Sequence, residues 1–133
     1  MLLKQNIKLV WLLPLFFQLF TSCQDLEEVE SISVSELEQI IKNESTVQIL
    51  DVRTAIEQDS GIILNAKRVN YLSNSFVTKS VEMLDKAEPV YIYCRSGRRS
   101  KVACRVLLDK GYEVYNVEGG YKAWQQHQEQ KIE

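Results

Sequence analysis

Short apolar runs typical of β-strands alternate along the chain with longer segments that have the apolar spacing of amphipathic helices. The strand-like runs are residues 46–53, 66–71, 90–94 and 112–117. The helix-like segments are residues 33–43, 54–60, 73–87, 100–110 and 119–128. A helix between two strands lets the strands lie parallel, so the alternation predicts an α/β fold with a mainly parallel central sheet.

Ser/Thr-x-x-Glu patterns predict where two of these helices begin. Ser33 with Glu36, and Thr54 with Glu57, have the spacing of a capping box, in which the hydroxyl and the carboxylate each accept a hydrogen bond from a backbone N–H. Ser73 is expected to cap the third helix with its hydroxyl.

The composition indicates one globular domain and argues against two kinds of site. Of the 133 residues, 45% are hydrophobic and 26% are charged, which suits a single core. The formal net charge of −2 argues against nucleic acid as a partner, since such proteins usually carry an extended basic surface. The single histidine, His127, lies near the C-terminus, and no Cys/His spacing indicates a metal site. We therefore expect no metal and no Cys–His catalytic pair.

The first 22 residues differ from the rest and are typical of a secretory signal peptide. Lys4 and Lys8 come before an apolar run from Leu9 to Phe20, and small residues follow. The run is shorter than the roughly 20 apolar residues that span a bilayer. The sequence "FTSC" at its end resembles the lipobox of bacterial lipoproteins, which implies cleavage before Cys23 and lipidation of that cysteine. Plain secretion and a buried N-terminal helix are the alternatives.

The chain is therefore expected to have four parts. They are a lipoprotein signal peptide at residues 1–22, an acidic tether at 23–31, a folded domain at 32–128 and a C-terminal tail at 129–133. The lipoprotein resemblance implies that the protein is anchored to a membrane through Cys23. It would then lie in the cell envelope, facing the periplasm or the cell surface.

The segment "CRSGRRS" gathers positive charge around one thiol. Cys94 comes at the end of the clearest strand and just before a helix, and arginines occupy positions 95, 98 and 99. Ligands bind at this edge of open α/β sheets, and the N–H groups of a strand–loop–helix turn favour an anion there. Gly97 allows the tight turn. A downward pKa shift of about two units, worth roughly 2.7 kcal/mol, would make the thiol mostly thiolate. The alternative is a buried cysteine beside a solvated basic patch.

Three motifs in order resemble the single-domain rhodaneses, a family of sulfurtransferases. They are "CRSGRRS", the stretch "LDVRTAIEQDSGII" from Leu50 to Ile63, and "VEGGYKAW" from Val117 to Trp124, and the resemblance covers residues 32–128. The family implies a parallel sheet with helices on both faces and a reaction without metal or organic cofactor. Cys94 would take a sulfur from a small anionic donor such as thiosulfate and pass it, as a persulfide, to cyanide or a thiol.

The resemblance also implies roles for the residues around the thiol. The backbone amides from Arg95 through Ser96 and Gly97 to Arg99 would surround the transferred sulfur. The side chains of Arg95 and Arg99 would hold the anionic end of the donor, with Arg98 a weaker candidate. Asp51 and Arg53 are interpreted as structural support of the loop, with Arg53 paired to an acid such as Glu57.

One segment departs from the family pattern. Where the family usually has Gly-His-Ile-Pro-Gly-Ala, residues 61–66 read "GIILNA", so Ile62, Leu64 and Asn65 replace the histidine, the proline and the second glycine. This segment normally shapes the rim of the site and leads into the next strand. The family pattern therefore does not define the rim geometry or the strand register here.

Two other classes of function compete with sulfur transfer. Phosphatases of related architecture have an arginine six residues after the cysteine, but Ser100 occupies that position and Arg99 lies at five. Non-catalytic binding modules of the family typically lack the cysteine. We also expect a monomer, and we expect Cys104 to be a small core residue that forms no disulfide with Cys94.

Overall fold

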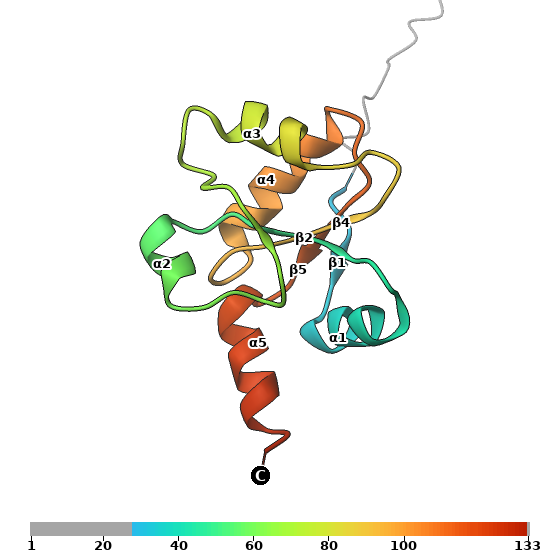
Figure 1. The fold of residues 1–133 in the computed structure, drawn as a ribbon, viewed down its shortest axis with the longest axis vertical. Coiled ribbons are helices and arrows are strands. Elements are labelled where there is room, and N and C mark those ends of the chain that lie inside the picture. The colour runs from blue at the N-terminus through green and yellow to red at the C-terminus, as the bar shows by residue number, and fades with distance from the viewer. Residues whose placement is uncertain (1–27, 133) are drawn as a thin grey trace, which may run out of the picture.

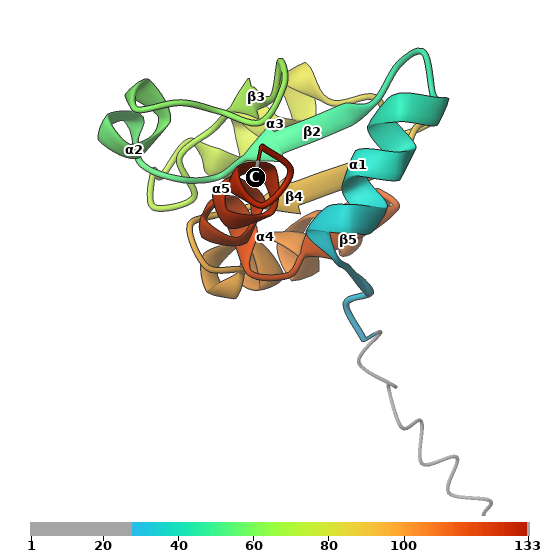
Figure 2. The same cartoon turned by 90° about the horizontal axis from the view of Figure 1, so that it is seen from below.

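Parallel strands form the central sheet of the protein, and helices cover both of its faces (Figures 1 and 2). The computed structural model describes residues 28–132. The strands are β1 (Ser31–Ile32), β2 (Gln48–Asp51), β3 (Lys67–Arg68), β4 (Val90–Tyr93) and β5 (Val114–Val117). The helices are α1 (Val34–Asn43), α2 (Ala55–Asp59), α3 (Phe76–Met83), α4 (Arg98–Leu108) and α5 (Gly120–Glu129). The five strands follow the order β1-β5-β4-β2-β3, and every pairing is parallel, which confirms the predicted fold class.

The two faces of the sheet carry separate apolar clusters. Helices α3 and α4 pack on one face, over side chains that include Leu50 and Ile92. Helices α1 and α5 pack on the other face, over side chains that include Ile49 and Tyr91. Neighbouring residues of one strand therefore enter opposite clusters, as the pleat of a strand requires. Figure 1 shows α3 and α4 above the sheet and α1 and α5 below it.

Strand β4 lies in the middle of the sheet, and its register positions the candidate site. All four of its residues are buried, because parallel strands with helices on both faces have no solvent-exposed side. Asp51 of β2 pairs with Tyr93 of β4, so the two strands end level with each other. The loops that follow β2 and β4 consequently meet at the carboxyl edge of the sheet.

Local signals predicted two helix starts correctly and one incorrectly. Both capping boxes are present, at the N-termini of α1 and α2. Helix α3 begins at Phe76 with Ser75 as its N-cap residue, so the prediction that Ser73 caps this helix is wrong. The Ser73 hydroxyl instead accepts a hydrogen bond from the backbone N–H of Ser75, within the turn before the helix.

The N-terminal end of the fold lies before the predicted boundary at residue 32. Val29 is buried, and the carbonyl of Glu30 accepts a hydrogen bond from the backbone N–H of Asn116. Ser31 of β1 pairs with Asn116 of β5. The last part of the predicted tether, residues 29–31, thus belongs to the sheet and core. The predicted signal peptide and Cys23 lie outside the described residues. None of the described helices is long and apolar enough to cross a bilayer.

The segment that departs from the family pattern forms a turn leading into β3. Leu64, at the position of the usual proline, has φ of 47° and an exposed side chain, and it is the one non-glycine residue of the described range with positive φ. Ile63 before it is fully buried, and its amide donates to the Tyr93 hydroxyl at 3.0 Å. Strand β3 then pairs with β2 through Lys67 opposite Leu50. The buried isoleucine and its hydrogen bond therefore fix this turn without the proline.

Candidate active site around Cys94

The loop between β4 and α4 surrounds the Cys94 thiol with hydrogen-bond donors. The Gly97 amide donates to Sγ at 3.1 Å, and the Ser100 hydroxyl donates to it at 3.5 Å. Gly97 has φ of +94°, and a Cβ there would lie 3.3 Å from the backbone nitrogen of Gly119. A side chain at this position would strain the backbone and press on the neighbouring loop, so glycine allows the turn that aims these donors at the sulfur.

These donors lower the pKa of Cys94. Burial alone raises the pKa of this thiol, whose residue is only 1% exposed. Hydrogen bonds from the Ser100 hydroxyl and from the amides of Ser100, Ser96 and Gly97 outweigh burial, so the pKa lies below its ordinary value. The loop therefore favours the thiolate, which is the nucleophilic form of cysteine.

The N-terminus of α5 holds the same loop from its other side. The Tyr121 amide donates to the carbonyl of Cys94 at 2.8 Å, and the Lys122 amide donates to that of Arg95 at 3.1 Å. Gly120 has φ of +56°, and a Cβ there would lie 2.3 Å from the Cys94 carbonyl oxygen. The Gly-Gly motif thus lets α5 approach the loop closely enough for its first free amides to bind these carbonyls.

The arginines of the loop have different surroundings. Arg99 forms a two-point ion pair with Glu57 at the start of α2, with nitrogen–oxygen distances of 2.7 and 2.8 Å. This ion pair lowers the pKa of Glu57 to about 2. The pKa of Arg99 is raised, mainly by Glu57 and to a smaller extent by the negative charge of Cys94. Arg95 and Arg98 are exposed, and neither pairs with a carboxylate within residues 28–132.

Arg53 pairs with an acid, as predicted, but the acid is Asp51 and not Glu57. Its side chain donates to both carboxylate oxygens of Asp51, the shortest contact being 2.7 Å, and both residues are buried. The Tyr93 hydroxyl donates to Asp51 at 2.7 Å, and the Arg53 guanidinium lies 3.9 Å from the centre of the Tyr121 ring. Arg53 pairs with Asp51 because Asp51 lies only two residues away, and its carboxylate also accepts a hydrogen bond from the Arg53 backbone N–H. These contacts connect the ends of β2 and β4 to α5 beneath the loop.

Two polar residues at the site were not identified from the sequence. The Ser100 hydroxyl has one proton, which it shares between the Oδ1 atom of Asn116 at 2.7 Å and the Cys94 sulfur at 3.5 Å. Asn116 lies in β5 with an exposed fraction of 4%. A polar residue in an otherwise apolar strand could have signalled this position, because buried amides need hydrogen-bond partners.

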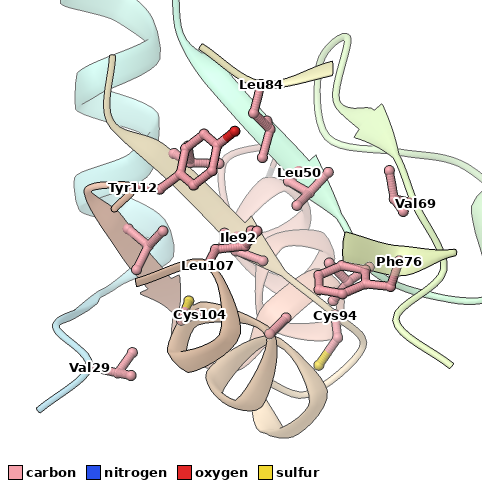
Figure 3. Packing of buried hydrophobic residues seen from close by; sticks show 14 residues of the cluster. Val29, Leu50, Val69, Phe76, Leu84, Ile92, Cys94, Cys104, Leu107 and Tyr112 are labelled. Atoms are coloured by element: carbon pink, nitrogen blue, oxygen red, sulfur yellow. The ribbon is translucent and has the colours of Figure 1, made fainter. Parts of the chain in front are cut away.

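Cys104 lies in the core on α4, as predicted. It is fully buried in the cluster that also contains Cys94, Leu107 and Phe76 (Figure 3). Burial raises the pKa of its thiol to about 12, so it remains protonated at neutral pH. The two cysteines are not bonded to each other. Within the described part of the chain, no group of three His, Cys, Asp or Glu side chains could hold a metal ion.

The fold and the Cys94 loop are those of a known family. The chain belongs to the rhodanese-like family, since the model of the rhodanese-like domain matches residues 33–127. A protein of Allochromatium vinosum named sulfurtransferase is 35% identical over 100 residues, which are 74% of this chain and 91% of that protein. Thiosulfate sulfurtransferase 18 of Arabidopsis thaliana is 36% identical over 122 residues, 83% of this chain and 88% of that one.

A solved structure agrees with this assignment. The crystal structure of a rhodanese-like domain protein from Staphylococcus aureus superimposes with a TM-score of 0.66 at 35% identity, covering 72% of this chain and 91% of that chain. The predicted family and the parallel α/β fold are therefore confirmed.

Proposed function

We propose that this protein is a sulfurtransferase that carries a sulfane sulfur on Cys94 as a persulfide. The observation that carries the proposal is the pair of donors, the Gly97 amide and the Ser100 hydroxyl, directed at a thiol with a lowered pKa. Relatives named sulfurtransferases support the same chemistry.

The reaction proceeds by two displacements at sulfur. The Cys94 thiolate attacks the outer sulfur of thiosulfate, the sulfur–sulfur bond of the donor breaks, and sulfite leaves with the bonding electron pair. Cyanide or a thiolate then attacks the outer sulfur of the persulfide, and Cys94 leaves as the thiolate. Each step exchanges one sulfur bond for another, so no external oxidant or reductant is required.

Residues of the loop assist in different ways. The amides of Ser96 and Gly97 and the Ser100 hydroxyl stabilise negative charge on sulfur. Arg99 contributes its charge beside the thiol while it remains paired with Glu57. Arg95 and Arg98 attract the anionic end of the donor, because their guanidinium groups are exposed and unpaired among the described residues.

Mass spectrometry of the intact protein tests the proposal. After incubation with thiosulfate and removal of excess reagent, the protein should gain the mass of one sulfur atom on the peptide that contains Cys94, and cyanide should remove it. Cys94→Ser should show no gain, whereas Cys104→Ser, the matched control, should react like the parent. Binding of thiosulfate without a covalent product would favour a non-catalytic module, and hydrolysis of phosphate esters without sulfur transfer would favour a phosphatase.

We propose, in addition, that Cys23 carries a lipid that anchors the protein in the cell envelope. The basic start, the short apolar run and "FTSC" in the sequence support this location. Metabolic labelling with a fatty-acid analogue should label the parent and leave Cys23→Ala unlabelled. An unlabelled parent that remains in the soluble fraction would refute it.

A further inference from the structure

A groove leads from the catalytic loop along the exposed face of α4. Two hollows form it, and Ser96, Arg98 and Val102 line both, so the hollows adjoin each other. The first, of about 420 Å³, is also lined by Tyr71 and by Arg99, the arginine that pairs with Glu57. The second, of about 470 Å³, extends away from the loop toward Arg105.

The second hollow is predominantly cationic. Arg98, Lys101 and Arg105 line it, all three are exposed, and none forms an ion pair with a carboxylate of the described residues. One acidic residue, Glu118, lines the same hollow. The three cations lie on one face of the helix at positions i, i+3 and i+7, so they span about 10 Å along its axis at 1.5 Å per residue.

The row of three cations is longer than a small substrate such as thiosulfate needs for binding. Thiosulfate and cyanide react at the loop itself, whereas Lys101 and Arg105 line only the hollow that extends beyond it. An extended peptide rises roughly 3.3 Å per residue, so about three residues fill the span. Acidic residues at alternate positions of such a peptide are about 6.6 Å apart, close to the rise of about 6 Å from Lys101 to Arg105.

We infer that this groove, along the exposed face of α4, binds an acidic, extended segment of a partner protein whose neighbouring cysteine accepts the sulfur from Cys94. The inference rests on the proposed function. The acceptor thiol loses its proton to solvent, and its thiolate attacks the outer sulfur of the Cys94 persulfide. The sulfur–sulfur bond at Cys94 breaks, the cysteine leaves as the thiolate, and the acceptor becomes the persulfide. Both hollows are shallow and open, and Val102 and Tyr71 line them beside the cations, so an extended peptide can contact apolar and charged groups together.

Fluorescence anisotropy of labelled peptides tests this binding without catalysis. The probes are the peptide Cys-Gly-Glu-Ser-Glu, its reversed sequence, and versions in which glutamine replaces each glutamate. The protein is the full chain with Cys94→Ser, so failure of sulfur transfer cannot affect the measurement. At least one acidic peptide should bind, and its glutamine version should bind at least 10-fold more weakly.

Charge reversal on α4 provides the second part of the test. Lys101→Glu with Arg105→Glu should weaken binding of the acidic peptide at least 10-fold. Lys110→Glu is the matched control, because Lys110 is exposed beyond the end of α4 and lines neither hollow. With Cys94 intact, the double variant should turn over thiosulfate and cyanide at the parent rate but transfer sulfur to the peptide more slowly.

Three outcomes would overturn the inference. Equal binding of the acidic and glutamine peptides would show that charge does not determine binding. If Lys110→Glu weakened peptide binding as much as the double variant does, binding would not depend on the groove. Binding to phosphatidylglycerol vesicles that depends on Lys101 and Arg105, without peptide binding, would assign the surface to a membrane. Absence of thiosulfate turnover in every variant would instead refute the proposed function and leave the binding result standing.

Discussion

Substitution of Glu57 by glutamine should destabilise the fold at neutral pH through the loss of its pairing with Arg99. Both side chains are 27% exposed, and two hydrogen bonds join them at 2.7 and 2.8 Å. The pKa of Glu57 is about 2, against an ordinary value of 4.5. This difference corresponds to about 3 kcal/mol at roughly 1.4 kcal/mol per pKa unit. Water around the partly exposed pair reduces the expected interaction to about 1–2 kcal/mol.

The pH dependence of this interaction has a definite sign. A carboxyl group whose pKa is lower in the folded state binds fewer protons there, so its contribution is complete above its ordinary pKa and is lost as pH falls. With values of 4.5 unfolded and about 2 folded, the contribution at pH 3 should be less than half of that at pH 5.

Urea unfolding of four proteins isolates the pair. The parent, Glu57→Gln, Arg99→Gln and the double variant form a double-mutant cycle, which can be followed by the fluorescence of Trp124. The coupling free energy at pH 7 should be about 1–2 kcal/mol, and it should fall by more than half between pH 5 and pH 3. A coupling below about 0.3 kcal/mol at pH 7, or one that is equal at pH 5 and pH 3, would refute the reasoning.

Three further predictions concern the loop and its supports. Cys94→Ser should abolish sulfur transfer, while Cys104→Ser should retain most activity and cost about 1 kcal/mol of stability, because it places a hydroxyl in the core; turnover and urea titrations measure both. Ser100→Ala should raise the pKa of Cys94, because the thiolate loses a hydroxyl donor; iodoacetamide alkylation of Cys94 should then be slower at a given pH below the pKa and reach half its maximum at higher pH. Gly120→Ala should destabilise the protein by about 2 kcal/mol or more and reduce turnover, because its methyl group would meet the Cys94 carbonyl at 2.3 Å. Gly111→Ala is the control, since φ is also positive there but the nearest atom of a non-adjacent residue, Nζ of Lys86, lies 3.9 Å away.

Each of these predictions has a contrary result. A halt of turnover in folded Cys104→Ser would indicate dithiol chemistry. An unchanged alkylation profile in Ser100→Ala would show that the backbone amides suffice. Equal losses in the two glycine variants would show that backbone strain, and not contact with the loop, dominates.

Features that depend on neighbouring residues could be predicted from the sequence. The apolar run at Val90–Tyr93 has Pro89 before it and a glycine turn after it, so the strand and the position of Cys94 at its end follow from local pattern. The capping boxes of α1 and α2 connect residues three apart, and both formed as expected. Ser73 was misassigned as the N-cap residue because Asn74 and Ser75 follow it, and any of these three residues can end a turn.

Features that depend on pairing between distant segments could not be predicted in the same way. Arg53 was expected to pair with an acid such as Glu57, but Glu57 binds Arg99, which follows a different strand, and this pairing depends on how β2 and β4 are aligned. Ser100 meets Asn116 because β4 and β5 are adjacent, and sequence spacing does not contain that information. The charge of the loop was therefore predictable, but the distribution of its arginines between ion pairs and solvent was not.

The bonds from the start of α5 to the loop have a consequence for biosynthesis. Among the described elements α5 comes last in the chain, yet its amides hold the carbonyls of Cys94 and Arg95. While the polypeptide is being made, β4 and α4 emerge from the ribosome before Tyr121 and Lys122 can reach the turn between them. We expect a nascent chain that ends before these residues to have a Cys94 of ordinary reactivity, so the nucleophile would be activated only once the start of α5 has bound the loop.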